Sequence, residues 1–208
     1  MPNTSSPRDR GRAAEPDGRL LDAAMSLLAE SGWAGLTQER MAERAGLSRV
    51  TAWRAGATKE AVVAALLHAL ERDFHESLWP VLTAEGSGLD RLREGLTRLC
   101  EVADRHLPLL LASDRVLHQA FRREHGGSGA DFSAPFARFI GEGRRDDSLR
   151  VLAETVDDAA DVVFNSVCWT YVHLRGVHLW PAAKARSLVL DLVEHGLACE
   201  SAQVPPGG

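Results

Sequence analysis

Apolar residues recur at three- and four-residue spacings along most of this 208-residue chain, and the strict alternation typical of strands is nearly absent. The first apolar stripe consists of Leu20, Ala24, Leu27 and Leu28. Asp17 before this stripe and Gly32 after it are start and stop signals for a helix. Similar stripes, most of them preceded by a capping residue, predict an all-α fold of about nine helices.

The expected helices differ in length along the chain. Residues 17–60 hold three short helices, and Thr37, Ser48 and Thr58 are placed to cap the second, third and fourth. Six longer helices follow the short ones, and the fourth helix, the first of these six, ends near Pro80 and connects the two groups. The chain is therefore expected to have two parts.

The last two helices are expected from Thr155 to about Arg175 and from Pro181 onward. Thr155 with Asp158 resembles a capping box, and "GEGRRDD" at residues 141–147 is expected to form a loop. The first of these two helices is apolar around most of its circumference, which is typical of a helix buried on more than one side. Its apolar residues are Val162, Val163, Phe164, Val167, Trp169, Tyr171, Val172 and Leu174. Either a partner subunit or a central place in a monomeric bundle would cover them.

Charge is distributed unevenly between the two parts. The whole chain has a net charge of -5. Residues 1–60 hold nine Lys or Arg and eight Asp or Glu, a net charge of +1, while the remaining residues carry a net charge of -6. An acidic body disfavours contact with nucleic acid, so any DNA contact is expected from the front part alone.

Several features bear on the compartment. The three cysteines, Cys100, Cys168 and Cys199, are widely spaced, which indicates reduced thiols and a cytoplasmic protein. The sequence contains no apolar run long enough to span a membrane, and no signal peptide is expected. Residues 1–16 and 201–208 are expected to be disordered tails.

Residues 37–54 have the spacing of a helix-turn-helix, with a short helix, a turn at Gly46 and a second helix of about two turns. In such a motif the second helix lies in the major groove of DNA. Arg49 can form two hydrogen bonds to guanine, and Val50 can contact a thymine methyl group. Trp53 can donate its indole N–H to a phosphate, and Arg54 lies on or near the same face.

A plainer reading of this segment stays open, because short helices linked by glycine and bearing scattered arginines occur in many α-helical proteins. Likewise, a Trp on such a helix is often a half-buried anchor. Spacing alone therefore does not separate a DNA-reading helix from an ordinary one.

The sequence of residues 20–67 resembles the DNA-binding domain of TetR-family transcriptional regulators. The matching segments are "LLDAAMSLLAESGWAGLT", "MAERAGLS", "TAW" where the family usually has Thr-Leu-Tyr, and "KE" opening the fourth helix. The resemblance implies a DNA-binding domain at residues 17–60 and a helical ligand-binding and dimerisation domain at residues 61–200. It also implies a homodimer, formed through the last two helices, that binds a palindromic double-stranded operator, with a small molecule as effector.

The resemblance assigns roles to eight residues of the front domain. Phosphate contacts fall on Thr37, Ser48, Trp53 and Lys59, and contacts at or near base edges fall on Arg49, Val50, Thr51 and Arg54. The sequence departs from the family at three positions, with Val50 in place of Gly, Ala52 in place of Leu and Gly56 in place of Phe. Ala52 and Gly56 remove apolar volume under the second helix of the motif, which Trp53 can partly refill.

Polar and aromatic residues within the apolar helices are the candidates for a ligand pocket. They are His68, Phe74, His75, His106, His118, Asn165, Trp169 and His173. Each has a purely structural alternative. Asp157, Asp158 and Asp161 form an acidic cluster, but the dipole at a helix start accounts for them. The expected ligand is hydrophobic or aromatic.

No motif of a known catalytic or metal site is present, such as GxSxG, a P-loop or HExxH, and neither a cofactor nor a metal ion is expected. The leading hypothesis is a DNA-binding transcriptional regulator, a repressor released by a small apolar or amphipathic molecule. The alternative is a helical small-molecule-binding protein whose front domain no longer reads DNA.

Overall fold

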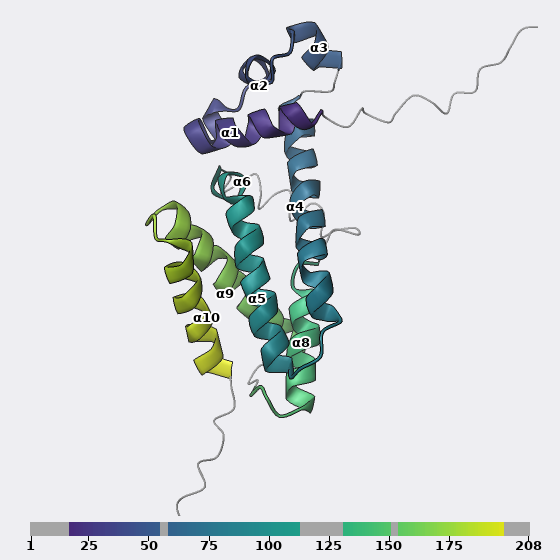
Figure 1. Cartoon of the computed structure of the whole chain (residues 1–208), viewed down its shortest axis with the longest axis vertical. Helices are drawn as coiled ribbons and strands as arrows, with labels where there is room; N and C mark the ends of the chain where they lie inside the picture. The colour runs from purple at the N-terminus through teal and green to yellow at the C-terminus, as the bar shows by residue number, and fades with distance from the viewer. Residues whose placement is uncertain (1–16, 55–57, 113–130, 151–153, 198–208) are drawn as a thin grey trace, which may run out of the picture. The chain divides into compact units, whose positions relative to one another are not determined.

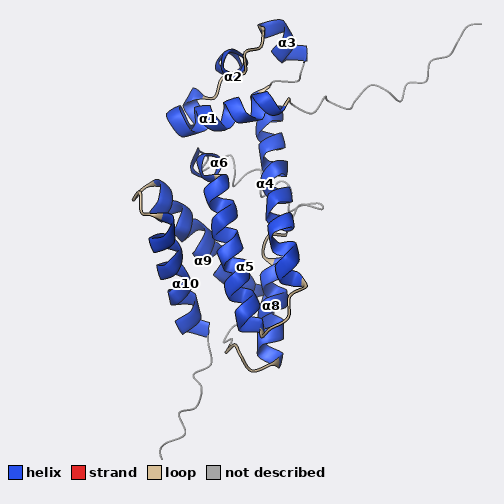
Figure 2. Ribbon diagram, in the orientation of Figure 1, coloured by secondary structure: helices blue, strands red, loops and turns tan. Residues whose placement is uncertain are grey.

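The computed structural model describes residues 17–54, 58–112, 131–150 and 154–197, and within these every regular element is a helix (Figure 2). This confirms the expected all-α fold. The chain divides into two compact units, Met1–Ala69 and Leu70–Gly208. The functional boundary expected at residue 60 stays a prediction, and the expected tails, 1–16 and 201–208, lie outside the described residues.

Unit 1 contains α1 (Gly18–Gly35), α2 (Gln38–Arg44), α3 (Arg49–Arg54) and the start of α4 (Lys59–Leu82) (Figure 1). Gly32 has a φ of 59° and interrupts the helical geometry of α1, as its role as a stop signal predicts. The buried residues of this unit are Leu20, Ala23, Ala24, Leu27, Leu28, Leu36, Met41, Ala42, Ala52, Val62, Val63, Leu66 and Leu67. The stripe expected in the first helix is therefore part of this core.

The predicted N-caps of unit 1 are present as hydrogen bonds. Thr37 Oγ1 accepts from Arg40 N at 3.3 Å, Ser48 Oγ from Thr51 N at 3.1 Å, and Thr58 Oγ1 from Ala61 N at 3.1 Å. Each bond satisfies a backbone N–H that has no partner within its own helix.

Unit 2 contains the rest of α4 together with α5 (Gly88–Arg105), α6 (Leu107–Ala112), α8 (Ala134–Arg145), α9 (Val156–Gly176) and α10 (Ala182–Leu197). Helix α5 contacts α8, α9 and α10, and is central to the unit (Figure 1). The largest fully buried side chains of the unit are Phe74, Leu78, Leu92, Leu96, Leu109, Phe136, Phe139 and Tyr171. The predicted cap of α9 is present, since Thr155 Oγ1 accepts from Asp158 N at 3.0 Å.

The loop expected at residues 141–147 is wrong over most of its length, because α8 continues to Arg145. Glu142 lies 2.7 Å from the Arg91 guanidinium on α5 and 3.2 Å from Arg138 one turn earlier, and both contacts favour the helix. Gly143 is not a helix stop. A Cβ atom on Gly88 would lie 2.1 Å from Gly143 N, so these two glycines let α5 and α8 approach closely.

In the described part of the chain, no helix is both long enough and apolar enough to cross a membrane.

Candidate nucleic-acid interface and cavity

Helices α2 and α3 form a helix-turn-helix within unit 1. The turn depends on Gly46, whose φ of 66° is strained for any residue that has a Cβ. Its N–H donates to Glu43 O at 3.1 Å, and Leu47 N donates to Ala42 O at 2.8 Å, which ends α2 and redirects the chain. Ala52 is 1% exposed, so α3 packs inward through this residue.

The other described side chains of α3 are exposed to solvent. Arg49, Val50, Thr51 and Arg54 are all exposed there, and Val50 is 61% exposed although it is apolar. Four of the eight predicted DNA contacts are therefore accessible on this one helix, and we call these four residues the α3 face. The side chain of Trp53 lies outside the described residues.

Arg49 on the α3 face pairs with Glu39 on α2, with 3.1 Å between Nη2 and Oε1. Both side chains are largely exposed, at 80% and 61%, and such surface pairs contribute only about 0–1 kcal/mol. The guanidinium can therefore exchange Glu39 for a base or a phosphate at little cost.

Three of the four predicted phosphate contacts, Thr37, Ser48 and Lys59, have local partners. The hydroxyls of Ser48 and Thr51 lie 2.8 Å apart, and Thr37 caps α2. Lys59 Nζ donates to Trp33 O at 2.8 Å and lies 4.0 Å from the centre of the Trp33 ring. Burial lowers the pKa of the Lys59 ammonium, against an opposing effect of Glu60. An ammonium has three N–H donors, so two remain for a phosphate.

A hollow of about 290 Å³ lies between α2 and α3, beside the Arg49–Glu39 pair. Its lining residues are Gln38, Glu39, Ala42, Arg49, Val50 and Ala52. This agrees with the expectation that Ala52 leaves apolar volume unfilled under the second helix of the motif. Gly56, the other residue in that expectation, lies outside the described residues.

Unit 2 contains a cavity of about 190 Å³, which we call the aromatic cavity. The apolar part of its wall consists of Leu70 and Phe74 from α4, Leu99, Val102 and Ala103 from α5, Leu110 from α6, Phe132, and Phe164 and Trp169 from α9. Its other lining residues are Asp131, Ser133, Asp161, Asn165 and Cys168. The Phe132 and Phe164 rings stack with their centres 6.2 Å apart, and Phe74 meets Phe132 edge to face at 5.0 Å.

Three of the eight ligand-pocket candidates line this cavity, namely Phe74, Asn165 and Trp169. His68, His75 and His173 are exposed residues that do not line it. His106 is half-buried beside Asp73 and is likewise no part of the wall. His118 lies outside the described residues.

No sequence pattern assigned Leu70, Phe132, Phe164 or Asp161 to a pocket. Phe164 belongs to the apolar circumference of its helix, and its direction depends on packing that periodicity does not give. The helix start alone explained Asp161 from sequence, yet this residue lines the cavity.

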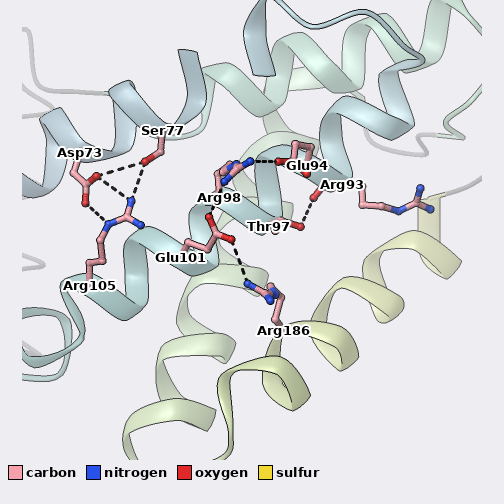
Figure 3. Close-up of polar contacts among 9 residues, drawn as sticks. All are labelled: Asp73, Ser77, Arg93, Glu94, Thr97, Arg98, Glu101, Arg105 and Arg186. Atoms are coloured by element: carbon pink, nitrogen blue, oxygen red, sulfur yellow. Dashed lines mark hydrogen bonds and ion pairs between the residues drawn. The ribbon is translucent and has the colours of Figure 1, made fainter. Parts of the chain in front are cut away.

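Ion pairs hold α4 and α5 together beside the cavity. Arg105 donates to Asp73 through Nε at 2.8 Å and through Nη2 at 2.9 Å, and also to Ser77 Oγ at 2.9 Å (Figure 3). Arg105 and His106 both hold the pKa of the Asp73 carboxyl below its usual value. Because Phe74 and Ala103 adjoin these residues in sequence, the pairs help to fix two sides of the wall.

A second polar group joins α5 to α10. Glu101 lies between Arg98 on its own helix, at 3.0 Å, and Arg186 on α10, at 3.5 Å (Figure 3). Arg93 adds a two-pronged bond to Glu194 at 2.6 and 2.8 Å. These contacts align α10 along α5.

The two described cysteines are buried thiols. Burial raises the pKa of both Cys100 and Cys168 to about 12, so both stay protonated and neutral at physiological pH. Cys168 therefore contributes an uncharged side chain to the cavity wall. Among the described residues, no cluster of His, Cys, Asp and Glu could hold a metal ion.

Solved structures with known roles share this arrangement. PfmR, a TetR-family transcriptional regulator from Thermus thermophilus, matches with a TM-score of 0.66 and 16% identity over 85% of this chain and 97% of PfmR. KstR2, the ketosteroid transcriptional regulator of Mycobacterium tuberculosis, matches with a TM-score of 0.65 and 18% identity over 91% of this chain and 100% of KstR2. SmeT in complex with triclosan matches with a TM-score of 0.64 and 20% identity over 91% of this chain and 97% of SmeT. No family model and no curated protein matches the sequence.

The chain therefore has the fold of the TetR-family transcriptional regulators. The likeness extends over most of the chain and includes unit 2, for which the sequence shows no motif. The resemblance read from residues 20–67 is confirmed at the level of the fold.

Proposed function

We propose that this chain is a sequence-specific DNA-binding transcriptional regulator and not an enzyme. In this proposal it is a repressor that leaves its operator when a small apolar or amphipathic molecule enters the aromatic cavity. The observation that carries the proposal is the α3 face, where cationic and apolar side chains stand exposed on the second helix of a helix-turn-helix. The shared fold supports it.

In this proposal the α3 face enters the major groove. Arg49 and Arg54 supply donors for guanine or phosphate, and exposed Val50 gains a thymine methyl as a neighbour. Thr37, Ser48 and Lys59 donate to phosphates, which sets the position of α3 without reading sequence. Trp53 and Thr51 complete the proposed contacts.

The DNA-bound form is proposed to be a homodimer. Val162 on α9 and Leu188 and Leu192 on α10 are 66%, 50% and 74% exposed, although all three are large and apolar. Leu188 and Leu192 share one face of α10, being four residues apart. Covering these residues with a second copy would remove apolar area from water, and two α3 faces about 34–36 Å apart would match a palindromic operator.

Ligand and operator must favour different conformations of the dimer, because only a difference in affinity shifts an equilibrium. Helix α4 is the proposed link. Leu70 and Phe74 of this helix line the cavity, and the same helix begins at Lys59, shortly after α3. The buried free thiols fit a protein that works in the cytoplasm.

The test is a gel-shift titration with the DNA upstream of the protein's own gene, set against a scrambled duplex of equal length. Specific binding should be tighter by a factor of about a thousand or more at physiological salt. An Arg49→Ala, Arg54→Ala double variant, in which both cationic residues lie on the α3 face, should lose most of this difference. Equal affinity for both duplexes would reject the proposed reading of this operator.

The hollow between α2 and α3 favours a second candidate function. A loosely packed motif can lose its fixed α3 geometry and leave a helical protein that binds small molecules without reading DNA. A systematic selection from random duplexes separates the two candidates. Recovery of one palindromic sequence supports the regulator, whereas failure to enrich any sequence, with ligand binding intact, supports the alternative.

A further inference from the structure

We propose that the molecule which enters the aromatic cavity is an amphipathic organic cation, with its apolar body among the aromatic rings and its protonated amine against the Asp161 carboxylate. The inference rests on the proposed ligand-binding role of unit 2 and adds the chemical class of the ligand. It follows from the placement of charge, of hydrogen-bond acceptors and of aromatic rings around one cavity.

The charged residues that the described segments contribute to the cavity wall are both acidic, Asp131 and Asp161. Asp161 lines the cavity, is exposed and forms no ion pair with any residue of the described segments. No Lys, Arg or His of those segments lines the cavity. A carboxylate without a cationic partner beside a partly apolar wall attracts a cation and repels an anion.

Hydrogen bonds within the wall leave mainly acceptors facing the ligand. Asn165 Nδ2 donates one of its two protons to Asp161 O at 2.8 Å, and its Oδ1 remains as an acceptor. Ser133 Oγ donates its proton to Asp131 Oδ1 at 2.8 Å, so its lone pairs remain. The Ser133, Asp161 and Asn165 side chains therefore offer lone pairs to a ligand that donates hydrogen bonds.

The apolar and polar groups lie at different depths. Leu99, Val102 and Cys168 are buried, whereas Asp161 and Asn165, one helical turn apart on α9, are exposed. The acceptors therefore lie at the rim of the cavity and the apolar residues lie inside it. A ligand that satisfies both carries its charge at one end and its apolar body at the other.

Aromatic rings add a contribution that favours a cation over a neutral ligand. Phe74, Phe164 and Trp169 line the same cavity, and the faces of aromatic rings attract ammonium groups. Asp157 and Asp158, at the start of the helix that carries Asp161, strengthen the negative potential. A carboxylate ligand would meet these charges with no cation in the described wall to bind it.

The test uses three probes that share one apolar body and differ in charge: phenylbutylamine, phenylbutanol and phenylbutyrate. Isothermal titration calorimetry at neutral pH with the full chain should show the amine binding about tenfold more tightly than the alcohol, and the carboxylate more weakly still. Asp161→Asn should remove the preference for the amine and leave the affinity for the alcohol unchanged. Asp161 is exposed, so this variant is expected to fold, which circular dichroism checks.

Asp157→Asn is the matched control, since it removes the same charge from the same helix at a residue that does not line the cavity. It should keep most of the preference for the amine. Equal affinities for the three probes, tighter binding of the carboxylate, or no binding of any probe at millimolar concentration would overturn the inference. Operator binding measured without a probe tests the proposed function separately. A preference for a neutral or anionic ligand would therefore contradict this inference but not the proposed regulator function.

Discussion

The Lys59 ammonium lies on the face of the Trp33 ring, 4.0 Å from its centre, and donates to the carbonyl oxygen of the same residue at 2.8 Å. Trp33 follows the interruption of α1 at Gly32, and Lys59 is the first residue of α4. One cation thus joins the end of α1 to the start of α4 by a cation–π contact and a charge-assisted hydrogen bond.

Lys59→Met should lower the free energy of unfolding by about 1 kcal/mol, since both contacts are lost while the aliphatic chain is largely kept. Urea denaturation followed by circular dichroism measures the change. Lys184→Met is the matched control, because Lys184 also lies 4.0 Å from a Trp ring centre, that of Trp180, on an exposed surface. An equal decrease in the free energy of unfolding in both variants would show that the hydrogen bond from Lys59 to the Trp33 carbonyl adds no stability.

The same Lys59→Met variant tests the predicted phosphate contact. Loss of one such contact should weaken binding to all duplexes about equally and lower the slope of log affinity against log salt by about one. Nitrocellulose filter binding across a salt series measures this slope. An unchanged slope would restrict Lys59 to its structural role.

Arg49→Ala should cost about 1–3 kcal/mol of operator affinity and relax the base preference at one position, because a two-bond contact to a base edge is lost. Competition gel shifts with single-base operator variants measure both effects. Glu39→Gln is the control, since it removes the charged partner of Arg49 and leaves the guanidinium in place. Specific binding that survives Arg49→Ala unchanged would remove Arg49 from base reading.

Leu192→Glu should weaken the dimer roughly a hundredfold, because two copies of an unpaired carboxylate would be buried where the exposed apolar face of α10 meets its partner. Multi-angle light scattering over a concentration series should show monomers. Trp79→Glu is the control, since Trp79 is 67% exposed but lies on α4. A wild-type chain that is monomeric at micromolar concentration would contradict the dimer itself.

The contribution of His106 to the free energy of unfolding should fall as the pH is lowered from about 7.5 through the titration range of histidine. Burial lowers the pKa of His106 below its usual value, even though Asp73 at 3.0 Å opposes the shift. The unfolded chain then binds a proton more readily than the folded chain. The contribution of His106 to the free energy of unfolding is complete above its unfolded pKa of about 6.5. It is lost as the pH falls from this value toward the lower pKa of the folded chain. The lowered pKa of Asp73 acts at far lower pH, below its ordinary value of 3.8.

His106→Gln should therefore flatten the dependence of the urea midpoint on pH between about 7.5 and 5.5, the range in which histidine titrates. Gln can still donate to Asp73, so the contact between α4 and the end of α5 is kept. His75→Gln is the control for the substitution itself, because it makes the same change at an exposed residue of α4. A His106→Gln profile identical to that of the wild type would exclude this histidine as a source of the effect.

Trp169→Ala should weaken the binding of phenylbutylamine about tenfold and leave ligand-free operator binding nearly intact, since its ring lines the cavity in unit 2. Calorimetry and gel shifts measure the two properties separately. Trp79→Ala removes an exposed indole outside the cavity and should change neither. Joint loss of operator binding and thermal stability in Trp169→Ala would make Trp169 a core residue instead.

The sequence by itself determined the helical class, most helix starts and the helix-turn-helix. Thr37, Ser48 and Thr58 each cap a helix through a bond to a residue three positions ahead, so the information lies within one helical turn. Gly46 likewise predicts the turn between α2 and α3 from local sequence, because the turn needs a positive φ, which glycine adopts readily. Apolar periodicity then identified which side of each helix is buried.

Only the tertiary structure decided which of these helices meet and what their side chains surround. Gly143 has the local signature of a helix end but serves a close crossing with α5 at Gly88, 55 positions earlier in the sequence. Asp161 is an ordinary acidic residue near a helix start until packing brings it to a wall shared with Phe74 and Phe132. Periodicity specifies the buried face of a helix but not its neighbours, because the partners of a cavity come from distant segments whose packing no local pattern encodes.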